Sequence, residues 1–471
     1  MLDWRDSLPP SAGDALERPL RDDPARLALV ASDARMTYHA LDTATDGAAA
    51  ALHDRGVRRG DVVAVSLPNT SEVVVTFYAV LRLGAVWLGI NRNLAPPEKQ
   101  YILDDAHAVL LVTEEEDLAR DQPSTPRLFV TRALAAHWQE ATGDPYPRVK
   151  PRADDAAGIA YTSGTTGRPK GVVHSHHNVL LPGAVLTATR GYGPSLRKGD
   201  CAALTILNMQ VTSTLLAAQA GGTQIVMDRV DPSGVASWIR EEAVNTWFGV
   251  PTLLRGLTGA EDVASEDLQS LTEVWTGGTF LPPAVRDAFE ARFDKRVFAT
   301  YGLTEAPTMV AMEERTSDAG RDSSGTALPH LVVEIRDDTG TVLPVGETGE
   351  ITVRAATTGP WKNAYRPMLE YLGQPSATAA TVQDGVLHTG DIGQLDATGN
   401  LVVRDRRHSL ILRGGANVYP AEVERVLLQL DGVSGASVVG VDDERLGQRV
   451  AAAVELDPGV DLDAAALAAH C

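Results

Sequence analysis

Apolar and polar positions alternate along residues 61–91 in the order strand, helix, strand. The run DVVAVSL at 61–67 is apolar enough for a buried strand, and SEVVVTFYAVLRLG at 71–84 has the spacing of a helix. A second apolar run, AVWLGIN, follows at 85–91. A strand, a helix and a second strand in such a short stretch are typical of a βαβ unit, so this region predicts part of a parallel sheet.

The same alternation extends over residues 201–300. Apolar runs predict strands at 201–207, 223–227, 246–250, 273–276 and 296–300. Helical patterns separate these strands, at 211–220, from about 231, after 250 and at 282–293. We therefore expect a doubly wound, mostly parallel sheet, whose ligands bind beyond the carboxyl ends of the strands. Two loops at such ends are candidate binding loops, at 276–279 and 301–305.

From about residue 328 the pattern changes to short apolar runs separated by polar turns. The turns DDTG at 337–340 and DATGN at 396–400 indicate antiparallel hairpins, which we favour over metal-binding loops. After Arg404 the pattern predicts a small α+β unit. We expect a large α/β body of doubly wound sheets with a small β-barrel-like part over residues 1–404, followed by a small domain over residues 405–471.

Charge and cysteine content exclude several classes of protein. The chain has 42 Lys and Arg against 62 Asp and Glu, which gives a formal charge of −20. This charge argues against binding to nucleic acid or to anionic membranes, because both need basic surfaces. The first residues lack the basic and apolar regions of a signal peptide, and no apolar run is long enough to span a bilayer. The two cysteines, Cys201 and Cys471, fit a reducing compartment, so we expect a soluble cytoplasmic protein.

The strongest chemical signal is the segment YTSGTTGRPKG at 161–171. Its hydroxyls can donate hydrogen bonds, its glycines let the backbone approach an anion closely, and its lysine supplies a positive charge. These residue types suit a polyphosphate, and the candidates are Thr162, Ser163, Gly164, Thr165, Thr166, Gly167 and Lys170. The segment is not a Walker A loop, because Pro169 stands where that motif requires glycine. The alternative, an ordinary polar hairpin loop, is disfavoured by the further motifs elsewhere in the chain.

The segment closely resembles the phosphate loop of the adenylate-forming superfamily, which includes acyl- and aryl-CoA ligases, adenylation domains of peptide synthetases and luciferases. Further matching motifs follow in the order of that superfamily. They are MTYHALD (36–42), LRLGAVWLGINRNLAPPE (81–98), TYGLTE (300–305), GETGEITVR (346–354), LHTGDIG (387–393) and RGGANVYPAEVE (413–424). The resemblance covers the chain from about residue 36 nearly to its last residue, and acyl- and aryl-acid:CoA ligases are the most similar members.

The resemblance implies a role for each matching residue. The residues of the 162–170 segment would hold the β- and γ-phosphates of ATP, Thr304 would contact the α-phosphate, and Glu305 would bind Mg²⁺. We therefore expect Lys170, Thr304 and Glu305 to be the catalytic residues. The rest of the nucleotide would contact Gly278, Thr279, Tyr301, Gly302, Asp391 and Arg406. Among these, Asp391 would accept hydrogen bonds from both ribose hydroxyls.

The acid substrate would occupy a pocket beside the nucleotide. Its expected lining is Asn208, Met209, Gln210, Thr276, Gly277, Gly302, Pro307 and Met309. Two amides among apolar neighbours favour a small or ring-bearing acid with a polar substituent over a long alkyl chain.

The reaction implied is attack of a carboxylate on the α-phosphorus of ATP, which gives an acyl-adenylate and pyrophosphate. A thiol of coenzyme A or of a phosphopantetheinyl carrier protein would then displace AMP. In the superfamily the small domain rotates between these half-reactions, here about a hinge at 404–409. Our leading interpretation is an AMP-forming acyl- or aryl-acid:CoA ligase. The alternatives are an adenylation enzyme that loads a carrier protein, an enzyme that adenylates another oxyanion such as nitrite, and a non-catalytic nucleotide-binding protein.

Three features depart from the superfamily pattern. Asn208 stands where a histidine is usual, and the hinge sequence DRRHS at 405–409 is closer to the luciferase and coumarate-ligase variant. No lysine follows Lys362, so the adenylation lysine of the superfamily has no match here. The sequence also stops inside an Ala-rich helical pattern, from which we expect a longer natural chain. We expect the chain as printed to bind ATP or AMP better than it forms adenylate.

Two further groups of residues are candidates for binding sites, and both are disfavoured. His174, His176 and His177 lie close together in sequence, but no third ligand or cysteine is near them, so a zinc site is disfavoured. Trp247 and Phe248 are expected in the core rather than in a stacking platform.

Overall fold

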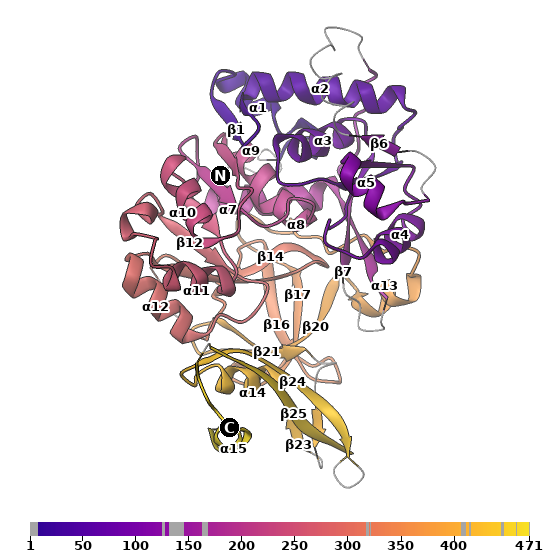
Figure 1. The fold of residues 1–471 in the computed structure, drawn as a ribbon. Helices are drawn as coiled ribbons and strands as arrows, with labels where there is room; N and C mark the ends of the chain where they lie inside the picture. The colour runs from indigo at the N-terminus through magenta and orange to yellow at the C-terminus, as the bar shows by residue number, and fades with distance from the viewer. Residues whose placement is uncertain are drawn as a thin grey trace.

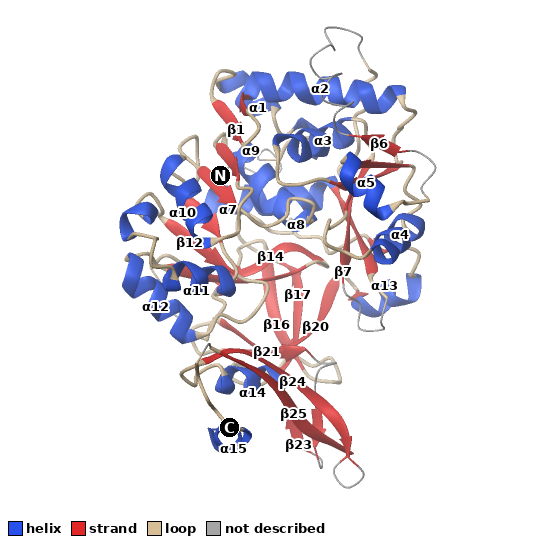
Figure 2. Cartoon of the chain, viewed as in Figure 1, coloured by secondary structure: helices blue, strands red, loops and turns tan. Residues whose placement is uncertain are grey.

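The structure is a computed structural model that describes residues 8–124, 128–130, 146–162, 168–316, 320, 322–406, 411–413, 416–443, 447–457 and 459–470. Within these ranges the chain forms four sheets, and helices cover the two largest (Figures 1 and 2). The C-terminal unit, drawn in yellow, lies at one end of the body (Figure 1). The predicted mixed α/β class, with a large body and a small C-terminal unit, is confirmed.

The βαβ unit predicted at 61–91 lies at the centre of a seven-stranded sheet. Strands β3 and β4 pair in parallel, with Val63 opposite Trp87, and α3 connects them. The strand order is β18, β8, β7, β4, β3, β5, β6. The strands are β3 (Val62–Ser66), β4 (Val86–Gly89), β5 (Leu110–Thr113), β6 (Leu128–Val130), β7 (Ala156–Thr162), β8 (Lys170–Ser175) and β18 (Glu370–Tyr371). The helices of this part of the chain are η2 (Ala12–Asp14), α1 (Glu17–Asp22), α2 (Tyr38–Asp54), α3 (Ser71–Arg82), α4 (Pro96–Asp105), α5 (Glu115–Asp121) and α7 (His176–Arg190).

A nine-stranded sheet contains the alternation predicted over 201–300. Its order is β15, β14, β13, β12, β11, β9, β10, β1, β2, and neighbouring strands from β13 to β1 are parallel. The strands are β1 (Leu27–Val30), β2 (Arg35–Thr37), β9 (Arg197–Asp200), β10 (Thr223–Val226), β11 (Thr246–Phe248), β12 (Glu273–Thr276), β13 (Val297–Leu303), β14 (Ala306–Met312) and β15 (Thr326–Ala327). The accompanying helices are α10 (Pro232–Glu241), α11 (Pro251–Gly259), η4 (Ser265–Leu268) and α12 (Pro283–Phe293).

The prediction of a strand at 201–207 is wrong. The strand of this region is β9, which ends at Asp200, and residues 201–206 form a loop. Strand β9 has no apolar pattern in the sequence because it contains charged residues. The ammonium of Lys198 lies 2.6 Å from a carboxylate oxygen of Asp200, and both side chains are fully buried. A buried charged strand is possible because the two charges neutralise each other.

The helix predicted at 211–220 is longer and has an unusual middle. It consists of α8 (Leu207–Met209), a π-helical segment η3 (Gln210–Leu215) and α9 (Leu216–Ala220). The π-helical turns are fixed by buried polar contacts, since Thr214 donates a 2.7 Å hydrogen bond to the Gln210 side chain, which in turn donates to Leu204 O at 2.8 Å. Segments of this kind are frequent at functional sites, and Asn208 lies at the start of this one.

The hairpins predicted after residue 328 are confirmed. Asp337 accepts hydrogen bonds from the amides of Thr339 and Thr341, and Asp396 accepts them from Thr398 and Asn400, so both carboxylates close their own turns. The resulting antiparallel sheet contains β16 (Leu331–Arg336), β17 (Gly349–Ala355), β19 (Val382–Gln383), β20 (Val386–Leu395) and β21 (Leu401–Arg406), and α13 (Pro375–Thr381) precedes β19.

The C-terminal unit is the small α+β unit predicted after Arg404, with two short strands before its first helix. Its sheet has the order β23, β22, β25, β24, and Figure 2 shows the long β24–β25 hairpin extending away from the body. The elements are β22 (Ile411–Arg413), β23 (Ala416–Val418), α14 (Pro420–Leu427), β24 (Val433–Asp443), β25 (Gly447–Leu456) and α15 (Ala464–His470).

The aromatic residues predicted in the core differ in their burial. Trp247 is fully buried in a cluster with Val235 and Leu254, as expected. Phe248 is only half-buried and lines a surface depression. Over the described ranges, no helix combines the length and the apolar composition that crossing a membrane requires.

Candidate functional site

The predicted phosphate segment connects two antiparallel strands. Thr162, the last residue of β7, is opposite Lys170, the first residue of β8. The residues between them that we expect to bind phosphate, 163–167, lie outside the described part of the chain. Helix α4 holds both sides of the segment, because Tyr161 donates a 2.6 Å hydrogen bond to Asp105 and Tyr101 donates to Pro169 O at 3.2 Å.

Lys170 and Glu305 meet at one aromatic side chain. The ammonium of Lys170 lies 5.0 Å from the centre of the Tyr371 ring, within the range of a cation–π interaction. The hydroxyl of the same tyrosine donates a 2.7 Å hydrogen bond to Glu305 Oε1. Tyr371 lies on β18, which pairs with β8, and Met368 next to this strand donates its amide to Glu305 O at 3.0 Å. Two of the three predicted catalytic residues are therefore brought together.

The third predicted catalytic residue, Thr304, is held through its backbone. His174 Nε2 lies 2.6 Å from Thr304 O, and the Asn178 amide lies 3.4 Å from His174 Nδ1. Burial lowers the pKa of His174 to about 4, so the imidazole is neutral near pH 7. Because the carbonyl can only accept, the proton must reside on Nε2.

A cavity of about 230 Å³ lies where β13 and β20 approach the C-terminal unit. It brings together most of the residues predicted to contact the nucleotide: Gly278, Thr279, Tyr301, Gly302, Asp391 and Arg406, with Thr276 beside them. Tyr301 donates a 2.6 Å hydrogen bond to Asp391 Oδ2, while Arg406 Nε lies 3.5 Å from Oδ1. The cavity therefore has a buried carboxylate at its wall, beside an exposed guanidinium.

The electrostatics link this cavity to the Lys170–Tyr371–Glu305 cluster. Burial raises the pKa of Asp391, and the negative charge of Glu305 raises it further, whereas Tyr301 and Arg406 oppose the change. The two carboxylates are therefore close enough to repel each other. A cation placed between them would relieve this repulsion.

The residues predicted to line the acid pocket are only partly brought together. Among them, Thr276 and Gly302 line the cavity, whereas Met209 and Met309 are almost fully buried and Asn208 is half-buried. Any Cβ at Gly277 would clash with Thr300, so this position requires glycine. The Pro307 side chain lies outside what the structure describes.

One expected pocket residue must be corrected. The Gln210 side chain is fully buried, and both ends of its amide are bonded within the chain, to Leu204 O in the preceding loop and to the Thr214 hydroxyl. Its amide therefore cannot contact a substrate without losing these bonds. Only one of the two amides that favoured a polar substituent, Asn208, remains half-exposed.

Three residues at the site were missed from the sequence. Tyr371 belongs to a two-residue edge strand with no hydrophobic periodicity. Phe280 and Arg425 line the cavity from opposite sides of the junction between the body and the C-terminal unit. Arg425 directly follows the matched segment 413–424, and this position was the only indication of it in the sequence.

The three clustered histidines bond to different parts of the chain. His174 bonds to Thr304 O, the Nδ1 of His176 accepts from the amide of Ala12, and His177 Nε2 lies 2.6 Å from Ala364 O. Over the residues that the structure describes, no three His, Cys, Asp or Glu side chains are grouped to hold a metal ion.

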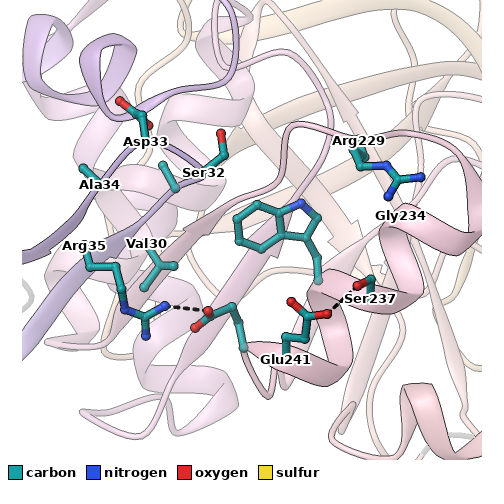
Figure 3. Close-up of a pocket in the computed structure, with 12 residues that line it drawn as sticks. Val30, Ser32, Asp33, Ala34, Arg35, Arg229, Gly234, Ser237 and Glu241 are labelled. Carbon is teal, nitrogen blue, oxygen red and sulfur yellow. Dashed lines mark hydrogen bonds and ion pairs between the residues drawn. The ribbon is translucent and has the colours of Figure 1, made fainter.

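A second, larger depression of about 560 Å³ lies near the β1–β2 end of the nine-stranded sheet, between the β1–β2 loop and α10 (Figure 3). Its charges are paired: Arg35 with Glu242 at 2.5 Å, and Arg229 with Asp231 at 2.6 Å. The strand order separates β1 from β13 by five positions, or about 24 Å at the usual spacing. This depression is therefore distinct from the Tyr301–Asp391 cavity, and we assign it no chemistry.

Comparison with known proteins places this geometry in a family. Residues 16–360 match the AMP-binding enzyme family, and residues 422–471 match the AMP-binding enzyme C-terminal domain. The chain is 33% identical over 441 residues to a long-chain-fatty-acid–CoA ligase of Mycobacterium tuberculosis, an alignment that covers 90% of the chain and 84% of that protein. It is also 33% identical over 419 residues to a feruloyl-CoA synthase of Amycolatopsis, covering 88% of the chain and 82% of that protein.

The fold agrees with this assignment. The crystal structure of the anthranilate CoA ligase AuaEII in complex with anthranoyl-AMP superposes with a TM-score of 0.88 at 26% identity, covering 100% of the chain and 92% of that protein. The resemblance identified from the motifs is confirmed: the chain belongs to the AMP-binding enzyme family.

Proposed function

We propose that this protein uses ATP to activate a carboxylic acid as an acyl-adenylate and then transfers the acyl group to the thiol of coenzyme A. The observation that carries the proposal is that the two clusters, Lys170–Tyr371–Glu305 and Tyr301–Asp391, both include a residue from the carboxyl end of β13 or from the loop that follows it, namely Glu305 and Tyr301. In parallel sheets such loops are where ligands bind.

The nucleotide is assigned to the cavity at Asp391. The ribose hydroxyls donate to Asp391 Oδ1, the adenine lies against Gly278 and Thr279, and Thr304 contacts the α-phosphate. Lys170, Thr162 and the segment 163–167 hold the β- and γ-phosphates. The carboxylate of the acid attacks the α-phosphorus, and pyrophosphate leaves. Positioning and neutralisation of charge supply the catalysis, because the nucleophile is the carboxylate of the acid itself.

Glu305 is suited to bind Mg²⁺. It is half-buried, and in the described part of the chain its carboxylate accepts one hydrogen bond, from Tyr371, which uses only Oε1. Among the described residues no salt bridge neutralises this carboxylate. One carboxylate oxygen together with phosphate oxygens is a donor set that Mg²⁺ commonly uses. When bound, the ion would offset the charge of the phosphates. Glu305 therefore fits this ion.

The acid is assigned to the space beside Thr276 and Gly302, with Asn208, Met209 and Met309 nearby. We keep a small or ring-bearing acid as the expected substrate class. It rests on Asn208, which remains half-exposed, since Gln210 no longer contributes an amide.

The two structural units are assigned to residues 1–404 and 405–471. Strand β21 runs two residues past this boundary, to Arg406, and Asp405 there accepts a 2.8 Å hydrogen bond from the amide of Ala421 at the start of α14. The junction is therefore a strand end that contacts both units, as a hinge for the small domain requires.

Exchange of labelled pyrophosphate into ATP tests the function. A panel of benzoic, cinnamic, anthranilic and fatty acids should include at least one that supports exchange, and coenzyme A should then release AMP with that acid. Binding of ATP and AMP measured by calorimetry provides a readout that does not depend on the acid. No exchange with any acid, together with no binding of ATP or AMP, would refute the proposal. Best turnover with long-chain fatty acids would refute only the substrate class.

A further inference from the structure

Arg425 places a cation from the C-terminal unit at the nucleotide cavity. It lies in the last turn of α14, and its guanidinium carbon is 4.3 Å from the centre of the Phe280 ring. Phe280 follows Gly278 and Thr279 directly, and both Phe280 and Arg425 line the cavity. A side chain of the small unit therefore packs against the body one residue from the expected adenine slot.

The Nε of Arg425 has no hydrogen-bond acceptor among the residues that the structure describes. Arg425 is only 9% exposed, and its Nε is buried without an acceptor. Within the described ranges, neither a hydrogen bond nor a salt bridge reaches Arg425, although Asp322 is close enough to favour its charged form. A buried donor without an acceptor is destabilising, and more so when the group is charged. The Phe280 ring offsets only part of this cost.

The three other arginines at the cavity are placed differently. Arg406 is largely exposed and lies beside Asp391, and Arg404 Nη1 lies 3.6 Å from Glu422 Oε1. Arg286, which belongs to the body, donates a 2.8 Å hydrogen bond to Glu313, while its Nε and Nη2 are buried without an acceptor among the described residues. Arg425 shares with Arg286 its burial, its place on the cavity wall and a buried donor without an acceptor, but Arg425 comes from the C-terminal unit. A ligand bound in the cavity could supply the hydrogen-bond acceptor that Arg425 lacks.

We propose that the Arg425 guanidinium donates hydrogen bonds to an adenine nucleotide bound in the cavity, and that the nucleotide thereby holds the C-terminal unit against the body. This inference rests on the proposed function, because it requires that the cavity be the nucleotide site. It makes Arg425 a binding residue contributed by the unit that moves between half-reactions in this superfamily.

A second arginine at the same junction supplies a matched control. Arg255, on α11, donates to Ser434 O at 3.1 Å, so it also joins the body to the C-terminal unit. It does not line the cavity. A variant at Arg255 therefore removes a contact between the units without removing a donor from the nucleotide.

The experiment compares R425A, R425K, F280L and R255A in the full chain. AMP and ATP affinities are measured by calorimetry, and hydrogen exchange of residues 420–427 is followed with and without AMP. We expect R425A to raise the Kd for AMP about tenfold, F280L about threefold, and R425K by an intermediate factor. R255A should leave the Kd unchanged. Protection of 420–427 by AMP should occur in the wild type and R255A but not in R425A.

Each result decides the matter. Wild-type affinity for AMP in folded R425A would overturn the proposal while leaving the nucleotide site intact. If R425A fails to fold, unchanged AMP affinity in both R425K and F280L overturns it equally. Equal losses in R425A and R255A would mean that the contact between the units, rather than the guanidinium, matters. A wild-type chain that binds neither AMP nor ATP would refute the proposed function itself, and this inference with it.

Discussion

The hydroxyl of Tyr371 donates a 2.7 Å hydrogen bond to Glu305 Oε1, while the ring of the same residue lies 5.0 Å from the ammonium of Lys170. One side chain therefore contacts the expected metal carboxylate and the expected phosphate lysine. Because the bond uses only one carboxylate oxygen, it fixes the orientation of Glu305 and leaves the second oxygen for a ligand. Tyr371 is a positioning residue with two separable contacts.

The two contacts of Tyr371 are separated by a pair of substitutions. Tyr371→Phe removes the hydroxyl and keeps the ring, so we expect weaker Mg²⁺ binding, by about tenfold, and little change in metal-free ATP binding. Tyr371→Leu removes both contacts and should weaken ATP binding as well. Titration of Mn²⁺ followed by electron paramagnetic resonance, with a non-hydrolysable ATP analogue, measures the first effect.

Tyr365→Phe is the matched control for these variants. The Tyr365 hydroxyl is buried without a hydrogen-bond partner in the described residues, so its removal should leave metal affinity unchanged. Equal metal affinities in Tyr371→Phe and the wild type would show that the hydrogen bond does not position Glu305.

Lys170→Ala should weaken ATP binding about tenfold to a hundredfold, because it removes a charge-assisted contact to phosphate. The fold should remain intact, since Lys170 is the first residue of its strand and is half-buried. Calorimetry with ATP measures the loss, and the exposed Lys362→Ala provides the control. Unchanged ATP affinity in Lys170→Ala would refute the assignment of the 161–171 segment to phosphate binding.

The buried pair of Lys198 and Asp200 should matter for stability. Lys198→Met leaves Asp200 buried without its cation, which we expect to lower the free energy of unfolding by about 3–5 kcal/mol. The double variant with Asp200→Leu should recover most of that loss, because no unpaired charge remains. Urea denaturation measures both. A single variant as stable as the wild type would show that water or rearrangement compensates the remaining carboxylate.

His174 should make the fold sensitive to acid. Burial lowers its pKa to about 4 in the folded chain, from an unfolded value of 6.5. The unfolded state therefore takes up the proton first, so stability is complete above about pH 6.5 and is lost as the pH falls toward 4. For a shift of this size the loss is on the order of 3 kcal/mol. Urea denaturation at several pH values should show a shallower decline in His174→Gln, and parallel declines would exclude His174 as a source.

Sequence pattern predicted the elements whose faces are uniformly apolar, and it failed where polar groups are buried in pairs. The βαβ unit at β3–β4 and the helix α12 follow from their apolar spacing. Strand β9 does not, because Lys198 and Asp200 are compatible with the interior only together. The burial of Gln210 is of the same kind, since one end of its amide bonds to Leu204 O in the preceding loop and the other end to the Thr214 hydroxyl.

The sequence indicates candidate site residues where they belong to a contiguous motif. Glu305 and Asp391 belong to contiguous motifs, and the structure brings them close enough to influence each other. Tyr371 and Arg425 owe their positions to contacts between segments that are distant in the sequence. No local pattern encodes such a contact, so these residues emerged only from the folded chain.

The π-helical segment Gln210–Leu215 has a consequence for insertions and deletions in this region. A π-helical turn spans i to i+5 and so holds one residue more than an α-helical turn. The extra residue is absorbed by widening the helix, and the flanking turns keep their phase. A single-residue deletion here could therefore restore a regular α-helix without rotating Asn208 away from its present direction. A one-residue deletion at this position would change the local surface around Asn208 and leave the flanking helical turns in phase.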